Sequence, residues 1–223
     1  MTNGAPAALA ASGVSDMLSS LVDAQGSARH PWFVELTAKP RDADPRSLAD
    51  AVHGLAYLYA RPSRISDVIV DRDDHPEVID WIAATIKTFD RERMYLMRVL
   101  VGAGPVPGTP GEVKSNAIMT AQVTAIDTLA RSERLGVALG AALAKIIDWH
   151  DLRRVIDAAA DRFGIDRAPN LLPDRDGSLA AASVAAAAAP IDRALGFGAR
   201  QLLVQHHAFW SLLQSRDQAR RSG

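Results

Sequence analysis

Apolar residues recur three or four positions apart along most of this 223-residue chain, and this spacing is what most constrains its fold. The segment 47–60 is a clear example, with Leu48, Val52, Leu55 and Tyr59 on one stripe. Apolar and polar residues do not alternate over a stretch long enough to predict a β-sheet. Alanine, leucine and arginine, which favour helices, dominate the composition. The sequence therefore predicts an all-α protein.

Proline and glycine divide the chain into segments of helical spacing. The clearest break is GAGPVPGTPG at 102–111, because proline removes a backbone donor and clashes with the preceding helical turn. The expected helices span about 6–24, 31–36, 47–60, 76–101, 115–163 and 178–218. The spacing leaves open whether 115–163 is one kinked helix or two, and it predicts interruptions of the last helix near Pro190 and at 196–198. Long helices with turn-rich connections predict an antiparallel up-and-down bundle of about four long helices plus shorter N-terminal helices.

Small residues recur every four positions in the most apolar part of the chain, at Gly136, Gly140 and Ala144. A row of this kind presents backbone in place of side chain, so a neighbouring helix can approach closely. We therefore expect the helix that carries the row to lie at the centre of the bundle.

The composition is that of an ordinary globular domain, with 48% hydrophobic residues, 23% charged residues and a net charge of -1. We expect one domain over 13–218, with a disordered leader at 1–12 and a disordered tail at 219–223. Near-neutral charge argues against a nucleic-acid or polybasic membrane surface. No apolar run reaches the ~20 residues of a transmembrane helix, and the N-terminus lacks the positive region of a secretory signal, so we expect a cytoplasmic protein.

The chain contains no cysteine. This excludes disulfides, thiolate nucleophiles, iron–sulfur clusters and cysteine-ligated zinc. Gly-x-Ser-x-Gly, the phosphate-binding loops and His-Glu-x-x-His are also absent from the sequence. No motif therefore specifies a cofactor or a reaction.

Polar residues on apolar stripes are the candidate site residues: Glu92, Glu133, His206 and His53. An ionised carboxylate is costly to bury unless it is paired or bound to a metal. Two glutamates and the histidines meeting in the core would form either a metal site or a salt-bridge network. The Glu-x-x-His motif of ferritin-like carboxylate sites does not occur in the chain.

Two further segments combine polar and aromatic residues. The stretches 30–33 and 206–210 each join histidine to aromatic residues, and we expect the aromatic rings in the core with the histidines at its rim. The cluster 148–151 joins acids, tryptophan and histidine, and here we expect a helix junction in which Asp151 caps a new helix.

Two interpretations of function remain. In the first, this is a soluble, non-catalytic helical bundle that acts by protein interaction or homo-oligomerisation. In the second, it is a metal- or cofactor-binding bundle of ferritin-like or haem-oxygenase-like architecture, with Glu92, Glu133, His206 and His53 as ligands. The absence of catalytic motifs favours the first, and we expect a homo-oligomer that binds neither nucleic acid nor membrane.

Overall fold

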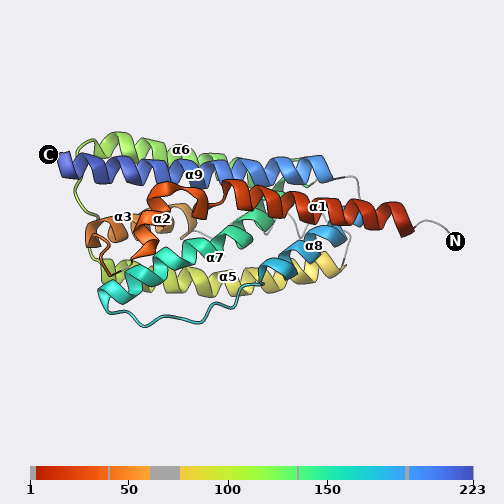
Figure 1. Ribbon diagram of the computed structural model, residues 1–223, viewed down its shortest axis with the longest axis horizontal. Helices are drawn as coiled ribbons and strands as arrows, with labels where there is room; N and C mark the ends of the chain where they lie inside the picture. The colour runs from red at the N-terminus through yellow and green to blue at the C-terminus, as the bar shows by residue number, and fades with distance from the viewer. Residues whose placement is uncertain (1–3, 40, 61–75, 135, 189–190, 223) are drawn as a thin grey trace.

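The computed structural model describes residues 4–39, 41–60, 76–134, 136–188 and 191–222. Within these ranges the chain forms eight α-helices, one short 3-10 helix and no strand, which confirms the all-α prediction (Figure 1). The elements are α1 (Gly4–Gln25), η1 (Ser27–Arg29), α2 (Pro31–Ala38), α3 (Pro45–Tyr59), α5 (Pro76–Ala103), α6 (Glu112–Ala130), α7 (Val137–Phe163), α8 (Arg175–Ala188) and α9 (Asp192–Ser222).

Local sequence explains where the helices start and stop. Before α3, the side chain of Asp44 accepts the backbone N–H of Arg46 at 2.9 Å, and Pro45 occupies the first turn. The segment 115–163 contains two helices, which answers the question left open by the sequence. Gly136 precedes α7 with a φ of 89°, a left-handed conformation that favours glycine over residues with a Cβ atom.

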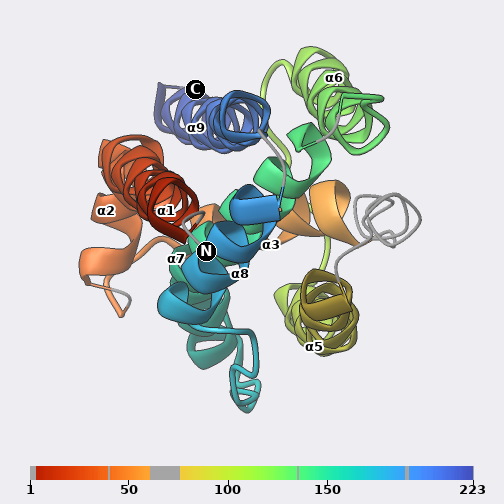
Figure 2. The ribbon, with the colours of Figure 1, turned by 90° about the vertical axis from the view of Figure 1, so that its right-hand side faces the viewer.

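The helix α7 is the centre of the fold. It packs against α1, α2, α3, α5, α6, α8 and α9, as its row of small residues predicted. Figure 2 shows α1, α5, α6 and α9 nearly end-on around it, while α7 runs obliquely between them. The helical fold class is therefore confirmed, but the specific antiparallel arrangement of about four long helices is not.

Glycine sets the distance between α7 and α9. A Cβ atom at Gly140 would lie 2.0 Å from the carbonyl oxygen of Leu195, and one at Gly198 would lie 2.0 Å from that of Val137. The glycines at 196–198 lie inside α9, so the interruption predicted there is wrong. These glycines allow close packing and do not end the helix. Pro190, the other predicted interruption, lies outside the described residues.

Other boundaries also differ from the sequence prediction. The helix α7 continues without a junction through 148–151, so the predicted capping role of Asp151 is wrong. The helix α1 begins at Gly4 and α9 runs to Ser222, which places helix in both the predicted leader and the predicted tail. Among the described helices, none is both long enough and apolar enough to cross a membrane.

The α7–α9 contact predicts opposite effects for two glycine-to-alanine changes. Gly140→Ala should lower the free energy of unfolding by about 1–3 kcal/mol, since the new methyl group meets a backbone carbonyl that cannot turn away. Gly13→Ala should raise it by up to about 1 kcal/mol, because Gly13 is in α1 with no atom near its Cβ position. Urea unfolding measures both, and equal effects would contradict the close α7–α9 approach.

Candidate functional site

The structure does not bring the four predicted ligands together. Glu92 on α5 and His206 on α9 are buried in separate hydrogen-bond networks, with exposed fractions of 2% and 1%. His53 on α3 is partly exposed, and its Nε2 donates to the carbonyl of Gly104 at 2.8 Å. Glu133 lies exposed in the turn between α6 and α7. Among the described residues, no group of three or more histidines and carboxylates is placed to hold a metal ion.

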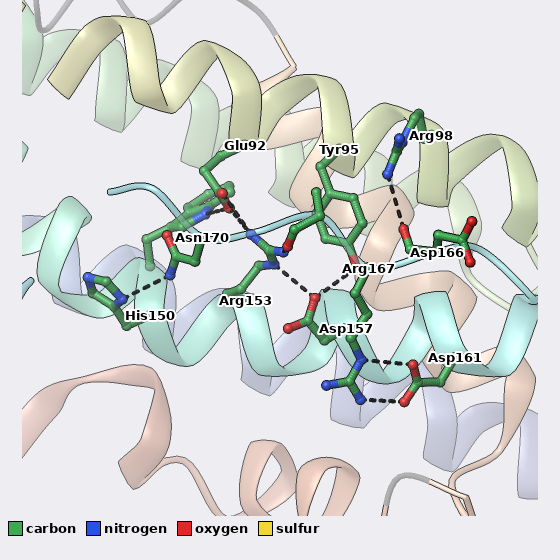
Figure 3. A network of polar contacts seen from close by, with 12 residues as sticks. Glu92, Tyr95, Arg98, His150, Arg153, Asp157, Asp161, Asp166, Arg167 and Asn170 are labelled. Carbon is green, nitrogen blue, oxygen red and sulfur yellow. Dashed lines mark hydrogen bonds and ion pairs between the residues drawn. The ribbon is translucent and has the colours of Figure 1, made fainter. Parts of the chain in front are cut away.

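The carboxylate of Glu92 forms a buried salt bridge with α7. Arg153 Nη1 lies 2.6 Å from its Oε1 and 2.8 Å from its Oε2. The indole Nε1 of Trp149 donates to Oε2 at 3.0 Å. Glu92 is therefore held by a salt bridge from α7, apart from Glu133, His206 and His53, with which the sequence had grouped it (Figure 3).

The guanidinium of Arg153 extends this network. Its Nε donates to Asp157 Oδ1 at 2.9 Å, and Tyr95 donates its hydroxyl to the same oxygen at 2.7 Å. The guanidinium carbon lies 4.1 Å from the centre of the Tyr95 ring, and Nη2 donates to the carbonyl of Ala168. Burial and the bond to Asp157 raise the pKa of Tyr95, so its hydroxyl stays protonated.

The connection between α7 and α8 is bound by side chains of α5 and α7. Arg98 on α5 donates to the carbonyl of Asp166 at 3.1 Å. His150 on α7 bonds at both ring nitrogens: Nε2 donates to the carbonyl of Pro173 at 2.9 Å, and Nδ1 accepts from Asn170 at 3.1 Å. These contacts attach the irregular connection between α7 and α8 to α5 and α7, and Figure 3 shows part of them.

A second buried network is centred on Asp148 of α7, which has an exposed fraction of 0%. Ser27 donates to it twice, from its backbone N–H at 2.7 Å and from its hydroxyl at 2.5 Å. His206 Nδ1 lies 2.5 Å from Asp148 Oδ2, and the hydroxyl of Tyr59 bonds to Nε2 of the same ring.

Proton positions in this network follow from burial. Burial, and secondarily the charge on Asp148, raise the pKa of Tyr59 well above its usual range, so the phenol keeps its proton. Tyr59 can therefore donate to Nε2 of His206, while Nδ1 of the same ring donates to Asp148. These side chains are at most 3% exposed, so the bonds from Asp148 through His206 to Tyr59 lie inside the core and join α7, α9 and α3.

The aromatic residues of 30–33 and 206–210 also pack together. Trp32 and Phe33 on α2 lie with ring centres 6.1 Å and 5.0 Å from that of Trp210 on α9, and all three side chains are buried. The rings of His30 and His207 meet edge-on at 4.7 Å, with His207 exposed. The prediction that the aromatic rings are core is confirmed. The prediction that the histidines lie at its rim is wrong for His30 and His206, which are both buried, and holds for His207.

A pocket of about 330 Å³ lies where α3, α5, α6 and α9 meet. Its lining is mostly apolar and includes Met97 and Leu100 of α5, Met119 of α6 and Leu213 of α9. Its volume is at the lower end of the range for small-molecule pockets. Nothing in the sequence indicated this pocket, because it depends on which helices become neighbours.

Polar groups at this pocket are engaged by other parts of the chain. Asp50 accepts from Arg216 Nε at 3.1 Å and Nη2 at 2.9 Å, and also from Arg220. The hydroxyl of Ser115 donates to the carbonyl of Gly111 at 3.3 Å. The pocket therefore presents an apolar interior, with its charges neutralised at one end.

The buried lysine of the fold, Lys145 on α7, lies apart from these networks. It is 3% exposed, and its Nζ lies 3.9 Å from the centre of the Phe89 ring. Burial lowers the pKa of Lys145 from 10.5 to about 8. A second pocket, of about 20 Å³, is lined by Lys145, Phe89 and Trp81.

Residues 22–221 match the model of a family of unknown function (DUF6975). The chain belongs to this family. The match spans both buried networks, the large pocket and Lys145. No curated protein and no solved structure matches the chain.

Sequence reasoning placed Asp148 in the polar cluster 148–151 but did not predict its burial, although a signal for it exists. Asp148 lies four positions from Ala144 and four from Leu152, both buried, so it belongs to an apolar stripe as clearly as Glu92 does. Because Asp148 lies within the polar cluster 148–151, the sequence suggested a helix junction there, and the helical spacing of Asp148 from buried residues was not used.

The salt bridge of Glu92 predicts a large effect from removing its partner. Arg153→Met should lower the free energy of unfolding by about 3–5 kcal/mol, because it leaves a carboxylate buried without a counter-charge. Adding Glu92→Met should recover much of this loss. The control is Arg167→Met, which breaks an exposed pair with Asp161 and should cost at most about 1 kcal/mol. Equal costs in chemical unfolding would mean that the buried pair is not essential.

Lys145 predicts a pH dependence of stability. Its folded pKa of about 8 is below the ordinary value of 10.5, so the unfolded chain binds more protons between these two pH values. The free energy of unfolding should therefore rise across this window, by up to about 1.4 kcal/mol per pH unit relative to Lys145→Met. The exposed Lys87→Met is the control and should keep the wild-type slope in low-salt urea titrations. A wild-type slope in Lys145→Met would contradict the prediction.

Proposed function

We propose that this protein acts by binding another polypeptide, and that the pocket between α3, α5, α6 and α9 receives apolar side chains of that partner. The observation that carries the proposal is the apolar surface at the pocket. Tyr57, Met97 and Val106 line it and are 52%, 38% and 48% exposed. Exposed apolar residues that gather at one place are typical of interaction sites.

The exposed row continues along α5. Met94 and Val101, which are 66% and 79% exposed, lie three positions before and four positions after Met97 and so share its face of the helix. Methionine is unbranched and polarizable, and it adapts to partner surfaces of different shape. The row and the pocket together resemble a groove that accepts the apolar face of a helix.

The same geometry favours a second copy of the chain as the first partner to test. The protruding residues lie on α5, which also forms one wall of the receiving pocket. In a two-fold dimer, each copy could insert Val101 or Met94 into the pocket of the other, which makes the surface self-complementary. We therefore carry the expectation of a homo-oligomer into this proposal.

Several polar groups at the pocket already bond to other parts of the chain, which supports binding without catalysis. Asp50 is paired with two arginines, and His53 and Ser115 donate to backbone carbonyls. None of these three presents the nucleophile–base pair that covalent catalysis uses. A small apolar molecule is the other possible occupant, and the experiment below distinguishes it.

Sedimentation velocity across protein concentrations tests the proposal. Wild-type protein should self-associate, and Val101→Arg should shift it to monomer, because a charge cannot be inserted into an apolar pocket without a partner. Val34→Arg is the matched control: Val34 is 47% exposed on α2, which Figure 2 places across the fold from α5 and α6. It should associate like the wild type.

A pocket-filling variant provides the second arm. Ala60 lines the pocket from the end of α3, and Ala60→Phe should block insertion without adding charge. If the wild type is monomeric, a photo-cross-linking residue at Met97 should capture a distinct polypeptide in cells, and Ala60→Phe should abolish that adduct. A monomer that forms no adduct dependent on the pocket would overturn the proposal. A small molecule retained in native mass spectrometry would identify the other occupant.

A further inference from the structure

The ammonium group of Lys145 has an unusual environment. The side chain is 3% exposed, and buried lysines are rare unless they are paired. Its interaction within the described residues is the cation–π contact with Phe89, at 3.9 Å, and no carboxylate there forms an ion pair with it. The fold therefore places a positive charge in its interior, and the part of the chain that the structure describes supplies no anion for it.

A second unsatisfied donor lies beside the same pocket. The indole Nε1 of Trp81 on α5 is buried, and the described residues supply no acceptor for it. Trp81 and Lys145 both line the pocket of about 20 Å³, together with Phe89 and Ile146. A buried N–H without an acceptor typically costs about 1–3 kcal/mol, so the indole N–H of Trp81 calls for an acceptor, and the nearby ammonium of Lys145 favours one that is negatively charged.

We propose that this pocket between α5 and α7 binds a single small monovalent anion such as chloride, held by the Lys145 ammonium and the Trp81 indole N–H. Its volume fits this occupant, because room for one water-sized group requires about 10–15 Å³. Larger anions such as sulfate would not fit. The apolar lining strengthens the attraction by excluding water from around the two charges.

An anion here would join α5 to α7 as the Glu92–Arg153 bridge does further along the same two helices. The bridge uses a carboxylate from α5 and a guanidinium from α7. The small pocket offers the cation from α7 and a neutral donor from α5, and the described residues supply no negative charge there. This inference does not depend on the proposed polypeptide-binding pocket, since the two sites share no lining residue.

Thermal unfolding in matched salts tests the inference. On moving from sodium gluconate to sodium bromide of equal ionic strength, the unfolding temperature of the wild type should change by about 2–4 °C more in the stabilising direction than that of Lys145→Met. Bromide binds only the folded wild type, whereas general salt effects act on both proteins. Trp81→Phe should retain part of this difference. Lys87→Met removes one exposed charge from α5 and should behave like the wild type.

Anomalous diffraction from wild-type crystals grown in bromide provides a direct readout that needs no variant. A bromide peak between Lys145 and Trp81 would support the proposal. Its absence would overturn it, as would an equal response to bromide in the wild type and Lys145→Met. Stabilisation by sulfate that Lys145→Met abolishes would also overturn it, because the pocket is too small for that anion.

Discussion

A carboxylate with no access to solvent, Asp148, is the constraint on which much of this fold depends. Burying such a charge is unfavourable unless its oxygens receive hydrogen bonds. Here the bonds come from Ser27 of η1 and His206 of α9, and His206 is held in turn by Tyr59 of α3. All four elements must be in place before the carboxylate is satisfied. The network therefore disfavours alternative packings of the same apolar helices.

The course of α7 through the molecule follows from its composition. Most of its residues are buried, and its apolar side chains point in all directions around the axis in its first half. A helix of that kind needs neighbours on every side and cannot occupy one corner of a four-helix bundle. Gly140 and Gly198 bring α9 close on one side, while Arg153 binds α5 on another. The oblique central helix is the geometry that satisfies these contacts together.

The two glutamates that the sequence singled out show how far periodicity predicts buried polar residues. Glu92 and Glu133 both lie on apolar stripes, yet only Glu92 is buried. The prediction that Glu133 lies on an apolar stripe required a helix that continues past Ala130. Because α6 ends at Ala130, Glu133 is not on a helix and has no apolar stripe to share. Periodicity predicts burial correctly only where the helix is continuous. It also cannot predict which distant residue becomes the partner, and Arg153 lies 61 positions from Glu92 in the sequence.

The burial of so many polar groups bears on function. Asp148, Glu92 and Asp50 are acids whose bonds are supplied within the chain, so they stabilise the arrangement of helices and are poorly placed for chemistry. Two features of the described residues are not accounted for in this way: the apolar pocket with its exposed row on α5, and the cation of Lys145. Both involve α5. An apolar surface in one case and a negative charge in the other would complete them, and this is why both proposals place a binding partner there.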